Sequence, residues 1–175
     1  SVLQNEVFFV SLRYKKCGIS QKKYSNMIAF RVMFNGELLE ACGITEVPTS
    51  WEEFFECCDM MQEAGMTPVS FMTGANAWTA QLWFSYALAS VAGKDAWTVG
   101  IESEEFKEAA KLVKKLYSYA PSDAIGATAG TVNTHFYNRE TAVYTNGAWI
   151  LGGMKSNTNQ TFYDNVKISS GLSYE

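Results

Sequence analysis

The segment TAVYTNGAWILGGM, residues 141–154, carries the pattern on which the fold of this chain depends. An alternating apolar run at residues 142–144 predicts a strand, which is expected to stop at an Asn146-Gly147 turn. Trp149 follows two residues later, inside a glycine-rich stretch. From periodicity alone, its indole is either a core side chain or an aromatic platform that faces a cleft.

Helical patterns with a few short strands surround this segment. A helix is predicted to begin after the capping residue Ser50, with Glu53 able to bond back toward the cap, and to end at Gly65. Residues 77–92 are apolar nearly all round, which predicts a central, well-buried helix. Further predictions are strands at residues 27–34, 67–71 and 166–169, and helices at residues 37–42, 104–117 and 131–138. The fold class is therefore α/β, a mainly helical lobe with a small sheet.

Composition limits the classes of protein to which the chain can belong. Its 175 residues, 47% hydrophobic and 18% charged, suit one soluble domain or a large lobe. The net charge of −4 argues against a nucleic-acid partner, which would favour clustered basic residues. The sequence contains no run of 18 apolar residues, so it predicts no membrane-spanning helix.

Residues that could carry catalysis are few. His135 is the only histidine, and a lone histidine beside an apolar helix face is more often structural. The four cysteines lack the C-x-x-C spacing of zinc or redox sites, and phosphate-binding glycine motifs are absent. Carboxylates in the first turns of predicted helices are explained by helix dipoles. The sequence therefore predicts no catalytic residue, no metal and no cofactor.

Aromatic stacking has better support in the sequence. Trp78 follows a loop, Gly74-Ala75-Asn76, and both Trp78 and Trp149 come just after a predicted strand. In open α/β sheets, ligands bind at the carboxyl ends of strands. The apolar face of a pyranose ring packs on an aromatic plane, and the side chains of Asn76 and Asn146 could bond its hydroxyls. The alternative is that both tryptophans are core residues.

Several segments together are similar to a known family. They are FNGELLEACGI at residues 34–44, VPTSWEEF at 47–54, AGMTP at 64–68 and FYNRETAVYTNGAW at 136–149. In order and spacing they resemble the carbohydrate-binding family of extracellular solute-binding proteins of ABC transporters. The match has departures, because Gly36 stands where the family usually has lysine and Cys42 precedes Gly43.

The resemblance implies a fold and a site. The family has two α/β lobes that close on a sugar, and this chain resembles the C-terminal lobe of that periplasmic-binding-protein type II fold. Residues 27–175 would form the substrate-binding lobe and residues 1–26 a segment near the hinge, with the other lobe and the family's C-terminal region absent. The implied ligand-binding residues are Trp149, Trp78, Asn146, Gly147, Asn76 and Gly74.

The same resemblance implies a setting and partners. The expected function is non-catalytic sugar or oligosaccharide binding in an extracytoplasmic location, periplasmic or at the cell surface. The expected partners are a carbohydrate and an ABC permease, with a lipoprotein anchor in the full-length protein. An exposed inter-lobe surface would favour self-association. Two alternatives remain open: a carbohydrate-active enzyme with paired carboxylates, and an interaction module that binds no sugar.

Overall fold

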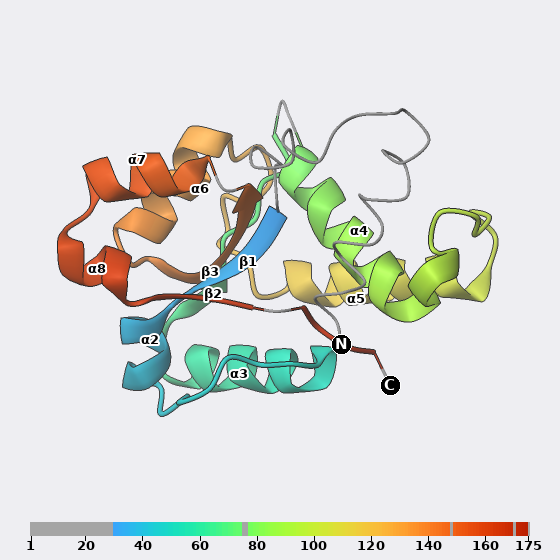
Figure 1. The fold of residues 1–175 in the computed structure, drawn as a ribbon, viewed down its shortest axis with the longest axis horizontal. Coiled ribbons are helices and arrows are strands. Elements are labelled where there is room, and N and C mark those ends of the chain that lie inside the picture. The colour runs from blue at the N-terminus through green and yellow to red at the C-terminus, as the bar shows by residue number, and fades with distance from the viewer. Residues whose placement is uncertain (1–29, 75–76, 148, 170, 175) are drawn as a thin grey trace, which may run out of the picture.

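A four-stranded mixed sheet forms the centre of the molecule (Figure 1). The computed structural model describes residues 30–74, 77–147, 149–169 and 171–174. The strand order is β2-β3-β1-β4, where β1 pairs antiparallel with β3 and β4, and β2 pairs parallel with β3. The strands are β1 (Phe30–Asn35), β2 (Thr67–Val69), β3 (Thr141–Gly147) and β4 (Val166–Ile168).

Helices pack against both faces of this sheet. Neighbouring residues of β1 belong to different hydrophobic clusters, Val32 to one and Met33 to the other, because successive strand side chains point to opposite faces. The helices are α2 (Gly36–Ala41), α3 (Trp51–Glu63), α4 (Trp78–Ala92), η2 (Gly93–Asp95), α5 (Glu104–Tyr117), α6 (Ala129–Tyr137), α7 (Ile150–Asn157) and α8 (Gln160–Asp164). Residues of α3, α4 and α5 contribute to the first cluster, and those of α6, α7 and α8 to the second. The predicted α/β class, mainly helical with a small sheet, is confirmed.

Helix α3 begins where its capping sequence predicts. The hydroxyl of Ser50 accepts a hydrogen bond from the backbone N–H of Glu53 at 3.1 Å. The Glu53 carboxylate accepts in turn from the backbone N–H of Thr49 at 2.7 Å and from its hydroxyl at 2.9 Å. These bonds satisfy amide groups that a helix start leaves without partners. They hold the pKa of Glu53 below its usual value, chiefly through the Thr49 backbone.

The lowered pKa of Glu53 makes the stability of this helix start depend on pH. Its folded-state pKa lies below the unfolded value, so its contribution is present above the unfolded pKa and is lost as the pH falls through the folded pKa. Glu53→Gln should therefore lower the melting temperature at pH 7, with the difference from the parent chain shrinking below about pH 4. Thermal unfolding measured across pH tests this. Glu56→Gln, an exposed position one turn further along α3, is the control. A Glu53→Gln effect of the same size at every pH would contradict the prediction.

Two sequence predictions about helix α4 and strand β3 are wrong. Only Thr79, Trp83 and Ala87 of α4 are fully buried, because one face of the helix meets the core while other positions remain partly or fully exposed. Asn146 and Gly147 do not form a turn. They are the last two residues of β3, since antiparallel pairing with β1 carries the ladder through them.

The region after β3 is also more helical than predicted. Gly152 and Gly153 lie inside α7 and not in a glycine-rich turn. Helix α6 begins at Ala129, two residues earlier than expected, because the hydroxyl of Thr128 caps it by accepting from the N–H of Thr131.

The predicted boundary between residues 1–26 and 27–175 lies outside the described residues. Among the helices that the structure describes, none is both long and apolar enough to cross a membrane.

Candidate functional site

The sheet brings the two predicted stacking residues into contact. Strands β2 and β3 run parallel, so their carboxyl ends lie at the same edge of the sheet. Trp78 opens the helix reached from β2, and Trp149 immediately precedes the helix that follows β3. Their ring centroids are 5.8 Å apart with an angle of 52° between the ring planes. The two indoles therefore lie in contact, inclined to one another, and are here called the tryptophan pair.

Trp149 is the more accessible member of the tryptophan pair. Its side chain is 50% exposed, whereas Trp78 is partly buried against the second hydrophobic cluster. The Trp149 ring lies directly over Gly147, where a methyl group would collide with the indole. Glycine at position 147 therefore leaves the space that the ring occupies at the end of β3.

Asn146 lies beneath this surface with its amide directed into the protein. The side chain is 3% exposed. Its oxygen accepts from the backbone N–H of Gly147 at 2.7 Å, and its amide nitrogen donates to the hydroxyl of Tyr144. The Tyr144 hydroxyl donates in turn to Asn133 Oδ1 on α6 at 2.8 Å. Burial raises the pKa of Tyr144, so its phenol keeps the proton that it donates.

The loop that leads to Trp78 is anchored to the segment before α6. The N–H of Gly74 donates to the carbonyl of Ala127 at 3.0 Å, and the hydroxyl of Thr73 donates to that of Ala124 at 2.8 Å. A Cβ at Gly74 would lie 2.5 Å from two backbone oxygens, so this close approach requires glycine. The predicted contact residue Asn76 lies outside the described residues. The ligand-binding roles of Gly74, Asn76, Asn146 and Gly147 stay predictions.

His135 lies beside two carboxylates. Its side chain is 14% exposed, and its Nε2 lies 3.3 Å from a carboxylate oxygen of Asp123 and 3.7 Å from one of Glu140. These contacts link α6 to the loop before it and to the start of β3.

The described residues include no group of three or more histidines, cysteines or carboxylates arranged to hold a metal ion. Cys42, Cys57 and Cys58 are free, and burial raises the pKa of each thiol.

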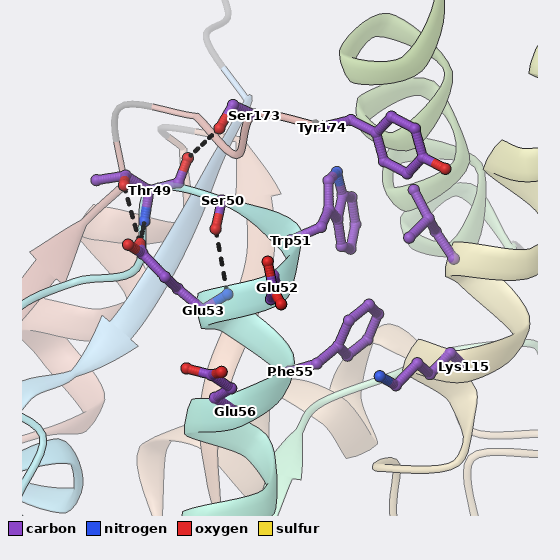
Figure 2. A pocket seen from close by; sticks show the side chains of 11 residues that line it. Thr49, Ser50, Trp51, Glu52, Glu53, Phe55, Glu56, Lys115, Ser173 and Tyr174 are labelled. Atoms are coloured by element: carbon purple, nitrogen blue, oxygen red, sulfur yellow. Dashed lines mark hydrogen bonds between the residues drawn. The ribbon is translucent and has the colours of Figure 1, made fainter.

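A cavity of about 530 Å³ lies elsewhere, between the start of α3, helix α5 and residues 173–174 (Figure 2). Trp51 and Phe55 form its apolar wall, and the ammonium of Lys115 reaches across from α5 to sit 4.2 Å from the centre of the Phe55 ring. No sequence signal indicates this cavity, because it depends on how two helices distant in the chain pack together.

The sequence matches one protein family over most of its length. The profile of the bacterial extracellular solute-binding protein family matches residues 19–171. No curated protein sequence shows significant similarity to the chain.

Solved structures with this fold are numerous, and three illustrate the likeness. A chitin oligosaccharide binding protein is 19% identical with a TM-score of 0.76, over 85% of this chain and 39% of its own. RafE from Streptococcus pneumoniae is 20% identical with a TM-score of 0.72, over 85% of this chain and 40% of its own. The GacH receptor of Streptomyces glaucescens is 23% identical with a TM-score of 0.65, over 83% of this chain and 38% of its own. The chain thus spans about two fifths of the length of these structures, and the likeness confirms the fold.

Proposed function

The chain belongs to the bacterial extracellular solute-binding protein family, and we propose that it supplies a carbohydrate-binding surface to a non-catalytic receptor for ABC-transporter uptake. The observation that carries this proposal is the tryptophan pair, two indoles in contact at the carboxyl edge of the sheet. A receptor of this kind works outside the cytoplasm. The proposal includes a membrane-anchored protein that passes its ligand to an ABC permease.

The geometry of the tryptophan pair suits a sugar. An indole face is apolar and broad, and the C–H face of a pyranose ring is the part of a sugar that gains from leaving water. Because the two ring planes are inclined by 52°, a sugar lying on Trp149 would meet Trp78 along one side. Such a corner favours a ligand with two or more rings, one on each indole.

The structural relatives support the carbohydrate class. Their names or titles include chitin oligosaccharide, raffinose, acarbose and β-D-galactopyranose as ligands. Within this chain, Trp149 and Trp78 are the proposed principal contacts, and Gly74, Asn76 and Gly147 lie on the segments beside them. Asn146 is 3% exposed and its amide bonds within the protein, so we propose that it supports the site from beneath and does not itself touch the sugar.

A thermal-shift screen of the chain tests the proposed ligand class. Raffinose, acarbose, galactose and chitin oligosaccharides serve as probes, with glycerol at matched osmolality as the control. A ligand that binds only the folded state raises the melting temperature, and above its dissociation constant the stabilisation grows with the logarithm of ligand concentration. We expect at least one oligosaccharide, tested to tens of millimolar, to raise the melting temperature above the glycerol control with this dependence. Melting temperatures that follow osmolality alone would reject the proposal, and release of reducing ends from a probe would favour the enzyme alternative.

A further inference from the structure

We propose that the buried hydroxyl of Tyr144 is a positioning group for the tryptophan pair, acting through Asn146 and Gly147. This inference rests on the proposed function for its effect on carbohydrate affinity. Its effect on the geometry of the indoles is independent of any ligand. The four residues Asn133, Tyr144, Asn146 and Gly147 are called the polar relay below.

The polar relay connects helix α6 to the floor beneath Trp149. The N–H of Gly147 donates to Asn146 Oδ1 at 2.7 Å, the Asn146 amide nitrogen donates to the Tyr144 hydroxyl, and this hydroxyl donates to Asn133 Oδ1 at 2.8 Å. Tyr144 is fully buried and Asn146 is 3% exposed. The relay therefore runs through the protein interior, where hydrogen bonds hold groups in place most firmly.

The direction of the bonds fixes the orientation of the Asn146 amide. A tyrosine hydroxyl can accept one hydrogen bond while donating another, and Tyr144 does both. If the Asn146 amide were turned over, its NH₂ group would face the N–H of Gly147 and its oxygen would lose that donor. The Gly147 N–H, together with a Tyr144 hydroxyl that donates its own proton to Asn133, thus selects the amide orientation in which Asn146 holds the Gly147 backbone.

The position of the Gly147 backbone in turn determines where the Trp149 indole lies. The Trp149 ring lies on Gly147 closely enough to exclude a Cβ there, and its centroid is 5.8 Å from that of Trp78. A change in the Gly147 peptide would therefore tilt the Trp149 ring against Trp78. The ring of Tyr144 itself is held by Phe136, with centroids 5.6 Å apart, so the phenyl group can stay in place when the hydroxyl is removed.

Tyr144→Phe removes the hydroxyl and leaves the Asn146 amide nitrogen and Asn133 Oδ1 without this partner. Circular dichroism of the chain without ligand is the first measurement, because two indoles at 5.8 Å give an exciton signal that depends on their mutual angle. Trp149→Phe defines the part of the signal that comes from the pair. We expect Tyr144→Phe to lose much of the exciton signal that Trp149→Phe removes. Binding of the best probe from the thermal-shift screen should weaken about tenfold.

Tyr137→Phe is the matched control. Tyr137 packs beside the same hydrophobic cluster from α6, and removing its hydroxyl should leave both the exciton signal and the affinity unchanged. A second pair of variants tests the far end of the relay. Asn133→Asp retains an acceptor oxygen and should behave like the parent chain, whereas Asn133→Leu should reproduce the loss seen with Tyr144→Phe.

The outcomes separate this inference from the proposed function. A full exciton signal in folded Tyr144→Phe would overturn the positioning role, whatever the affinity. Equal losses in Tyr144→Phe and Tyr137→Phe would overturn it as well, since they would reflect general loosening of the cluster. A reduced exciton signal in a chain that binds no probe sugar would uphold the polar relay and reject carbohydrate binding.

Discussion

Trp149→Ala is expected to weaken carbohydrate binding about thirtyfold while changing the stability of the chain much less. The indole is half exposed, so the folded chain gains only part of its burial energy. A bound sugar would cover the remaining face and bury on the order of 100 Å² of apolar surface, a gain of roughly 2 kcal/mol with stacking included. A loss of that size corresponds to about thirtyfold in affinity.

Isothermal titration with the best probe sugar measures this effect. Trp97→Ala is the control, because Trp97 is 75% exposed on the segment between α4 and α5 and does not belong to the tryptophan pair. Trp149→Phe should fall between the parent chain and Trp149→Ala, since a smaller ring covers less of the sugar. Equal affinities for the parent chain and Trp149→Ala would show that the ligand does not stack on this residue.

The second large effect concerns the core and not the site. Phe54 of α3 is fully buried, and its ring lies within about 6 Å of the rings of Phe34, Trp51 and Trp83. Phe54→Ala leaves a cavity among rigid aromatic side chains that cannot close around it. The free energy of unfolding should therefore fall by about 3–5 kcal/mol, a large part of the total for a domain of this size.

Urea unfolding followed by circular dichroism measures the Phe54→Ala effect. Met60→Ala on the same helix is the matched control, because Met60 is 41% exposed and its loss should cost less than about 1 kcal/mol. Similar unfolding midpoints for the two variants would contradict the assignment of Phe54 to the centre of the core.

The elements that were predicted correctly carry their own local signals. Helices α3 and α5 each begin at a serine whose hydroxyl accepts from a backbone N–H three residues on, at Glu53 and at Phe106. Helix α2 is followed by Gly43 in the left-handed region, as its position after the helix predicts. Such signals act within a few residues, so they can be recognised in a sequence without knowledge of the fold.

The errors occurred where distant contacts override local preference. The pairing of Asn146 with Arg31 extends β3 through residues that usually form turns. The two glycines of α7 are poor helix formers, but Ile150 and Met154 of the same helix are buried in the second cluster and hold it in place. Burial of these two residues depends on strands and helices far from them in the sequence.

The candidate site was predictable only as separate parts. The sequence places Trp78 and Trp149 each beyond a strand, but their contact depends on β2 and β3 being parallel neighbours. The polar relay was not predicted, because Tyr144 counts as apolar in a strand pattern. Its hydroxyl meets Asn133 only when α6 packs on the sheet.

The most direct test of carbohydrate binding is a titration followed by NMR of the indole N–H groups. The chain has five tryptophans, so five such signals are expected, and each can be assigned by substitution. On addition of the best probe sugar, the signals of Trp78 and Trp149 should shift in a saturable manner. Those of Trp51, Trp83 and Trp97 should stay in place. Five unchanged signals, or shifts confined to the latter three, would contradict the assignment of a carbohydrate site to the tryptophan pair.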